Sequence, residues 1–259
     1  MGKTVWEIVD LSERINFPLY FPIDTANIGS DRRSLYDVLT KAIRSGEISE
    51  VYSDSYFNTK KTFKDIKSSL MLISLSNEGR EQLNVLGLNE EFKDLNPGQI
   101  SKEDADKLIS KGIKPEYIVE SDLTAQDVTQ YKIKGYWYFD KRQSELKYRL
   151  LGICPITPDV YTMNSDEKDY IELFWVFFPA AREVLHAAKS FNDKNSAMPI
   201  SFDQILNSRR FNAVIYQEEN VYGDRGITSY IKDNAQNQLL EAERVKEKIR
   251  NFEEDMWNY

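Results

Sequence analysis

The sequence has little of the chemistry on which most active sites depend. It contains one histidine and one cysteine in 259 residues, so an intramolecular disulfide is excluded. A zinc site built on these two residues would need two carboxylates, and no spacing in the chain suggests them. Nucleophile elbows, phosphate-binding loops and H-E-x-x-H helices are also missing from the sequence. These absences favour a non-catalytic protein without a cofactor or a metal ion.

Long apolar runs and an excess of basic charge are missing as well. No run approaches the roughly 18 apolar residues of a membrane-spanning helix, so we expect no direct membrane span. The net charge of −8 argues against nucleic acid as the main partner, because phosphate binding needs a basic surface. Hydrophobic residues make up 41% of the chain, which excludes a disordered protein. The length suits one large domain or two small lobes.

The lone histidine and cysteine have ordinary structural explanations. His186 lies in a predicted helix, four residues after Arg182, and a triad would also need a positioned nucleophile and a carboxylate. Cys154 lies in a predicted strand, where a cysteine is usually a small core residue. The acidic residues between Glu103 and Asp106 lack the spacing and the glycine of a calcium-binding loop. None of these positions predicts a catalytic or metal site.

Three strand-like runs stand at the centre of the chain: Tyr131–Phe139, Glu145–Ile153 and Tyr170–Phe178. The first two alternate with period two, as strands with one buried face do. Between them, Asp140–Ser144 has the length of a hairpin loop. The third run is apolar from Leu173 to Phe178, so it is predicted to be the most buried strand of an antiparallel meander, with Trp175 in the core.

Further elements flank this meander. The other predicted strands are Val5–Leu11, Glu47–Tyr52 and Phe211–Tyr216. The other predicted helices are Leu35–Ile43, Ser76–Leu88, Ser101–Lys111, Pro179–Phe191 and Ser201–Asn207. Phe17–Pro22 is expected to be extended because proline restricts its neighbours. Ser30 or Asp31 is expected to cap the first helix, and Gly46 stands where a left-handed C-cap would fall.

The sum of these elements predicts an α+β fold, an antiparallel β-sheet packed by helices and closed by a long C-terminal helix. A faint repeat of strand, aromatic-proline pair, helix and strand leaves open two related lobes. Four segments follow: an N-terminal α+β lobe (1–56), a variable insert or linker region (57–128), a central β-meander with helices (129–233) and the C-terminal helix (234–259).

The C-terminal helix carries a narrow apolar seam. It opens at Asn234 and has a length of about 36 Å. Its apolar residues step by threes and fours between dense mixed charges: Leu239, Ala242, Val245, Ile249, Phe252 and Met256. Such a seam packs on the chain's own sheet or on a neighbouring molecule, as coiled-coil seams do. Packing against the chain's own sheet is the more frequent outcome for such a helix. Binding of a partner through the seam is the more specific hypothesis.

Six short motifs stand in the order typical of one family. They are GICP (Gly152–Pro155), ELFWVFFP (Glu172–Pro179), SFDQI (Ser201–Ile205), ENVYGDRGI (Glu219–Ile227), LLEAERVKEKI (Leu239–Ile249) and DMWNY (Asp255–Tyr259). The chain resembles the GldN/PorN family over about Thr129–Tyr259. WEIVDL (Trp6–Leu11) and FPLYFP (Phe17–Pro22) are also similar to that family, whereas Phe57–Gln126 is not matched.

The resemblance implies a structural subunit of the type IX secretion and gliding machinery of Bacteroidetes-type bacteria. The implied partners are a GldK/PorK-like outer-membrane lipoprotein, a GldM/PorM-like periplasmic motor component and further copies of the chain in a large ring. The implied location is the periplasm, at the outer membrane, for a mature chain whose signal peptide has been removed. Taken alone, the start Met1-Gly2-Lys3 without a signal-peptide segment is that of a cytosolic protein.

Two other functions stay open at this point. Tyr136, Trp137 and Tyr138 could stack on a sugar in a periplasmic carbohydrate-binding protein. Since Trp137 and Tyr138 point to opposite faces of a strand, at most one face would serve. A hydrolase would need an acid–base pair, and 42 acidic residues make any one pair uninformative. A pocket with clustered, pKa-perturbed groups would favour the hydrolase, and a flat exposed aromatic row would favour the sugar-binding protein.

Overall fold

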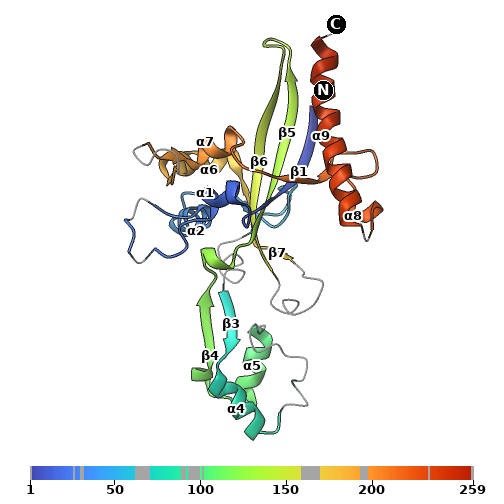
Figure 1. Cartoon of the computed structure of the whole chain (residues 1–259). Coiled ribbons are helices and arrows are strands. Elements are labelled where there is room, and N and C mark those ends of the chain that lie inside the picture. The colour runs from blue at the N-terminus through green and yellow to red at the C-terminus, as the bar shows by residue number, and fades with distance from the viewer. Residues whose placement is uncertain are drawn as a thin grey trace.

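An antiparallel sheet forms the centre of the protein (Figure 1). The computed structural model describes residues 2–25, 27–29, 32–61, 71–88, 92, 100, 102–158, 170–192, 198–232 and 234–257. The sheet has seven strands: β1 (Gly2–Asp10), β2 (Val51–Tyr52), β5 (Gln130–Asp140), β6 (Glu145–Pro158), β7 (Tyr170–Glu172), β8 (Trp175–Phe177) and β11 (Val214–Glu218). Its strand order is β11-β1-β5-β6-β8-β2, and β7 pairs with β6 off this path. The predicted α+β class is confirmed.

The meander of β5, β6 and β8 is present as predicted. β5 and β6 pair from Gln130–Ile156 to Asp140–Glu145, with a bulge after Lys134. The third predicted strand is divided, because Leu173 and Phe174 leave the ladder between β7 and β8. The Leu173 N–H donates instead to the Pro155 carbonyl at 3.1 Å, and both side chains remain buried.

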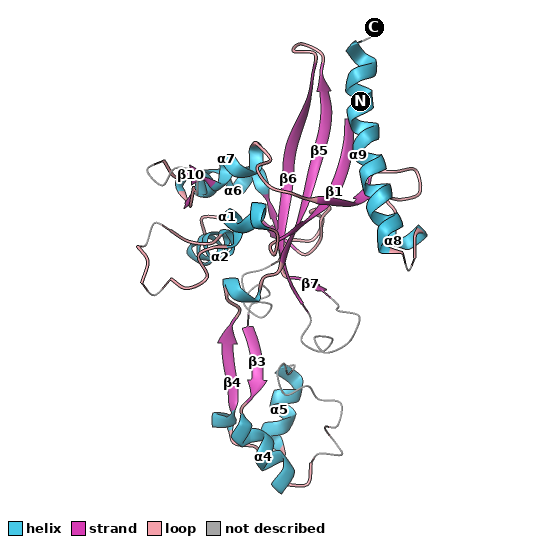
Figure 2. Ribbon diagram, in the orientation of Figure 1, coloured by secondary structure: helices cyan, strands magenta, loops and turns pink. Residues whose placement is uncertain are grey.

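Helices flank the strands on the left and on the right in Figure 2 and pack against the sheet. They are α1 (Phe17–Tyr20), α2 (Leu35–Ser45), α6 (Phe178–Ala187), α7 (Phe202–Asn207), α8 (Ile227–Tyr230) and α9 (Ala235–Trp257). The main core joins α2, α6 and α7 to the sheet through residues such as Leu39, Phe178, Phe202 and Ile133. At the β11 edge, α9 covers the same face. The opposite face buries Trp6 and other aromatic side chains.

Several local predictions need correction. Phe17–Pro22 was expected to be extended, but Phe17–Tyr20 forms a helical turn, since Pro18 suits the first turn of a helix. Ser34 caps α2, and its hydroxyl accepts from the Asp37 N–H at 3.2 Å. The expected caps, Ser30 and Asp31, lie outside the described residues. Gly46 ends α2 with a left-handed φ of 82°, as predicted.

Other boundaries shift along the chain. The helix expected to reach Phe191 ends at Ala187, and Lys189–Ser190 (β9) then pairs with Ile200–Ser201 (β10). The strand expected over Phe211–Tyr216 is β11, which begins at Val214 and ends at Glu218. Neither α8 nor the strand Ile118–Asp122 (β4) was predicted, because both are short and follow polar sequence.

A second cluster of elements projects from the sheet at the lower end of Figure 1. It contains β3 (Met71–Leu75), α4 (Asn77–Val85), α5 (Lys102–Ser110) and β4 (Ile118–Asp122), and β3 pairs with β4. Both helices were predicted. The four-segment division stays a prediction, although β1 and β2 from segment 1–56 share one sheet with β5 and β6.

Candidate interaction surface

The middle of the predicted seam on α9 is buried within the chain. Ala242, Val245 and Ile249 are each 4% exposed. They pack with Val5 of β1 and Ile215 of β11 in one apolar cluster. Contacts inside the chain therefore account for these three side chains, and they are available to a partner only if α9 leaves the sheet.

The two ends of the seam differ from its middle. Leu239 is exposed near the start of α9, and so is its neighbour Leu240. Phe252 is half-buried, and its ring meets that of Phe139 edge-on with 6.3 Å between the centres. The side chain of Met256 lies outside the described part of the helix. Partner binding by the seam stays a prediction.

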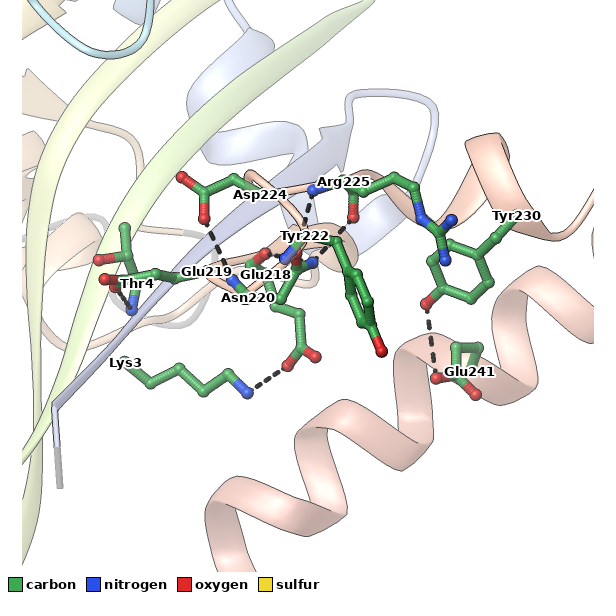
Figure 3. A network of polar contacts seen from close by, with 10 residues as sticks. All are labelled: Lys3, Thr4, Glu218, Glu219, Asn220, Tyr222, Asp224, Arg225, Tyr230 and Glu241. Carbon is green, nitrogen blue, oxygen red and sulfur yellow. Dashed lines mark hydrogen bonds and ion pairs between the residues drawn. The ribbon is translucent and has the colours of Figure 1, made fainter.

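The loop that precedes α8 has apolar side chains that are much more exposed to solvent than those of the α9 seam. Residues 219–226 connect β11 to α8 and form the network drawn in Figure 3. Val221 is 93% exposed and Tyr222 is 74% exposed. The chain turns directly after them, where Gly223 and Asp224 adopt left-handed φ angles of 77° and 58°. An aspartate tolerates this conformation better than most residues with a side chain.

One asparagine side chain holds this loop in shape. The Asn220 side-chain oxygen accepts from the backbone N–H groups of Tyr222 at 3.0 Å and Arg225 at 3.3 Å. Its amide donates to the carbonyls of Glu218 and Arg225, both at 3.1 Å. The Asn220 backbone N–H donates to an Asp224 carboxylate oxygen at 3.1 Å. The Asn220 side chain thus supplies hydrogen-bond partners for backbone groups beyond the end of β11, where the regular strand pairing stops.

The loop is also anchored to its surroundings. Glu219 and Thr4 exchange two hydrogen bonds, since the Glu219 N–H donates to the Thr4 carbonyl at 2.9 Å and the Thr4 N–H donates to the Glu219 carboxylate at 3.1 Å. Lys3 forms an ion pair with Glu218. The Tyr56 hydroxyl, from the loop after β2, donates to Asp224 at 3.2 Å. These contacts restrict the loop on both sides.

Arginine and tyrosine side chains extend the exposed surface towards α9 (Figure 3). The Arg225 guanidinium lies 5.4 Å from the ring centre of Tyr222 and 4.7 Å from that of Tyr230. The Tyr230 hydroxyl donates to Glu241 at 3.4 Å. Burial, assisted by the Glu241 carboxylate, raises the pKa of Tyr230, so its phenol stays protonated as a donor. We call Val221, Tyr222, Arg225 and Tyr230 the tip surface.

A cavity of about 360 Å³ lies beneath α9. Its floor contains Glu7 and Arg209, whose guanidinium donates to both Glu7 oxygens at 2.9 and 2.8 Å. The Tyr148 hydroxyl donates to the same carboxylate at 3.3 Å, and burial raises the pKa of Tyr148. A carboxylate engaged in this way is a structural ion pair, because its charge and acceptor sites are already used.

The residues considered for catalysis do not come together. His186 is exposed on α6, and its Nδ1 lies 3.9 Å from Asp203, which Arg182 binds at 2.9 Å. Cys154 is buried on the far side of the sheet, as predicted, and burial raises the pKa of its thiol well above the usual range. Within the described ranges, no group of three or more histidine, cysteine, aspartate or glutamate residues is placed to hold a metal ion.

The three aromatic residues of β5 divide between the two faces. Trp137 lies on the side of α9, where the Arg209 guanidinium is 5.3 Å from its ring. Tyr136 and Tyr138 lie on the opposite face and stack at 6.1 Å and 16°. Arg149 covers the Tyr138 ring at 5.1 Å, which removes area that a sugar would use. The aromatic row is therefore short and partly occupied.

Sequence reasoning missed the tip surface, although its signal is present. ENVYGDRGI was noted only as a family motif, yet it places two apolar residues between an asparagine and a Gly-Asp turn. Turn residues on both sides predict a loop, and adjacent apolar side chains at its tip form a contiguous exposed patch of the kind that marks interaction sites. The motif does not show that β1 contacts the residues that precede the loop tip.

The fold and this surface define an α+β protein in which an anchored loop exposes residue types common in protein interfaces. The family model described as "Gliding motility associated protein GldN" matches residues 1–258. The chain therefore belongs to the GldN family and is a component of the gliding motility and type IX secretion machinery. The match includes Phe57–Gln126, which the short motifs left unmatched. No curated protein matches the chain. In the described part of the chain, no helix is long and apolar enough to cross a membrane.

Proposed function

We propose that the chain is a non-catalytic structural subunit that joins a GldK/PorK-like outer-membrane lipoprotein in a periplasmic ring. A GldM/PorM-like motor component and further copies of the chain are the other proposed partners. Membership of the GldN family supports the setting. The tip surface supports the mode of action, which is binding to other proteins.

The observation that carries this proposal is the exposure of Val221 and Tyr222 on a loop ordered by Asn220. A loop that is already ordered loses little conformational entropy on binding, so more of the contact energy appears as affinity. Tyrosine and arginine dominate the residues on which binding energy concentrates, and the tip surface contains two tyrosines and one arginine. We therefore assign the lipoprotein contact to the tip surface.

The double substitution Val221→Ser and Tyr222→Ser tests this assignment. Neither side chain supports the core, so the melting temperature should stay within about 1–2 °C of the parent's, as for other exposed positions. Co-purification and size-exclusion chromatography with the lipoprotein should show loss of the complex. Val85→Ser is the matched control, because Val85 is 85% exposed at the end of α4, away from the tip surface.

A double variant that keeps the full complex would remove the tip surface from the proposal. If Val85→Ser abolished the complex instead, the contact would lie on the projecting cluster of α4 and α5. A separate check addresses the non-catalytic part. His186→Gln should restore gliding and secretion in a strain that lacks the protein, and a well-folded variant that fails to do so would contradict the proposal.

A further inference from the structure

We infer that the outer edge of β6, between Lys147 and Leu151, is a docking site for an extended acidic segment of another protein, which would join the sheet as an additional strand. This site is separate from the tip surface and goes beyond the proposed function. It does not depend on which partner binds the tip.

The pairing of β6 leaves this edge open. β6 pairs with β5 along Glu145–Ile156, but its second neighbour, β8, begins only at Gly152. β7 joins later still, at Ile156. Among the described strands, Lys147–Leu151 therefore has a neighbour on one side only. In Figure 1 the upper part of the hairpin rises above α6 and α7, and no further strand lies beside β6 there.

An open edge offers backbone groups as well as side chains. In a strand with one neighbour, every second residue directs its N–H and C=O away from the sheet. An extended segment can satisfy these groups along its whole length, which is the basis of strand addition in peptide recognition. The hairpin thus supplies affinity through the backbone, and side chains along the edge decide which segment binds.

The charge of the hairpin selects an acidic partner. The part of the hairpin around this edge, residues 139–151, contains four basic and two acidic residues, which gives +2 in a chain whose net charge is −8. The basic residues are Lys141, Arg142, Lys147 and Arg149, and the acidic ones are Asp140 and Glu145. The sign of the hairpin is thus opposite to that of the whole molecule, and opposite charges steer association.

Arg149 is the cation best placed for this role. Its side chain is exposed, and its Nε donates to the Tyr138 hydroxyl at 3.2 Å. Within the described residues no carboxylate forms an ion pair with Arg149, whereas Lys147 is paired with Asp140 at 2.9 Å. A carboxylate on an added strand could therefore pair with Arg149 without displacing an existing partner.

The same charges exclude other occupants. Basic residues on an edge discourage pairing between two like edges, so a second copy of this hairpin is disfavoured. Tyr148 and Leu150 lie on the other face of β6, under Arg209 and the main core. The preferred segment therefore alternates acidic residues with apolar ones. An anionic lipid surface would satisfy the charges of the hairpin but not its backbone edge.

Three short synthetic peptides test the inference on the full chain. One alternates valine with glutamate, one alternates valine with lysine, and the third is the glutamate peptide with N-methylated backbone amides. Fluorescence anisotropy measures binding, and hydrogen exchange measures protection of the amides between Lys147 and Leu151. Only the unmethylated glutamate peptide should bind and protect these amides. Arg149→Glu should weaken its binding about fivefold.

Arg80→Glu is the control, since it makes the same charge change on α4, away from the hairpin. Equal weakening by both variants would reduce the effect to net charge and overturn the inference. Equal binding of the methylated peptide would show charge attraction without strand pairing. No binding of any peptide, or binding of anionic phospholipid vesicles in place of the glutamate peptide, would also overturn it.

Discussion

Trp175 shows at the scale of one residue how the sheet is held together. It is fully buried on the face opposite the helices, as its position in the apolar run predicted. Its indole N–H donates to Glu172 at 2.7 Å, and its ring meets the Phe57 ring edge-on, with 6.5 Å between the ring centres. The side chain therefore joins β8, β7 and the loop after β2.

Replacing Trp175 by alanine should lower the free energy of unfolding by about 3–5 kcal/mol, because a large cavity opens and the Glu172 carboxylate loses a donor. Equilibrium unfolding in urea measures this difference. Tyr222→Ala serves as the exposed control and should change stability by no more than about 0.5 kcal/mol. An unchanged midpoint for Trp175→Ala would show that β8 is not a core strand.

Lys134 is a second residue with a measurable signature. Its ammonium lies 4.9 Å from the Trp6 ring centre and 4.7 Å from that of Tyr56, and it donates to the Ser55 carbonyl at 2.9 Å. Burial lowers the pKa of Lys134 below its ordinary value of 10.5, and the more distant Asp224 carboxylate opposes this only in part. The charged form is thus less favoured in the folded state than in the unfolded one.

This lowered pKa predicts a dependence of stability on pH. Between the folded pKa and 10.5 the unfolded chain binds a proton that the folded chain has released, so the free energy of unfolding rises with pH in this window. Lys134→Met should remove that contribution. The stability of the variant relative to the parent should therefore fall as pH rises towards 10.5, in urea unfolding at a series of pH values. A constant difference would contradict the assignment.

At the scale of elements, α9 depends on the sheet for its place. Its apolar stripe is narrow, yet Ala242, Val245 and Ile249 align with the cluster around Val5 and Ile215. The remaining faces of α9 carry mixed charges that face solvent, and these charges do not determine the position of the helix. The contact with the sheet therefore decides where α9 lies.

Substituting Val245 and Ile249 with aspartate tests this dependence. Two buried carboxylates without partners should cost at least about 4 kcal/mol and remove cooperative unfolding or detach α9. Thermal melting and helix content by circular dichroism record either result. Leu240→Asp is the control on the exposed side and should melt like the parent. A double variant that melts like the parent but loses its complexes would favour the partner-binding seam.

At the scale of the whole molecule, the projecting cluster has a core of its own. Its described core residues all lie between 73 and 118, and they include Leu75, Leu83, Leu108 and Ile113. None of them belongs to the clusters that hold the main sheet. The strands that enter and leave the cluster pair at Met71 and Asp122, so its two ends are adjacent.

Replacing residues 72–121 by a short glycine–serine linker should leave the main sheet folded. A unit with its own core and adjacent ends can be removed at little cost to the remainder. Circular dichroism should show one cooperative transition within a few degrees of the parent's. Removal of 234–259 is the comparison, and it should destabilise the sheet because Val5 and Ile215 lose their cover. Loss of cooperative melting after the first deletion would show that the cluster supports the sheet.

The sequence by itself determined the elements whose causes are local. The alternation of apolar and polar residues with period two predicted β5 and β6. Ser201 and Gly46 predicted the ends of two helices, and the apolar run predicted that Trp175 is buried in the core. The ordered motifs identified the family, which the match over residues 1–258 confirms. Each of these signals lies within a short window, where backbone geometry and side-chain pattern suffice.

Only the tertiary structure decided the features that join distant residues. Glu7 pairs with Arg209 across 202 positions, and no local pattern announces such a partner. The division of the third strand, the burial of the middle of the α9 seam and the exposure of Val221 follow from which surfaces meet. Hydrophobic burial is non-directional, so a pattern can show that a side chain needs cover without showing what covers it.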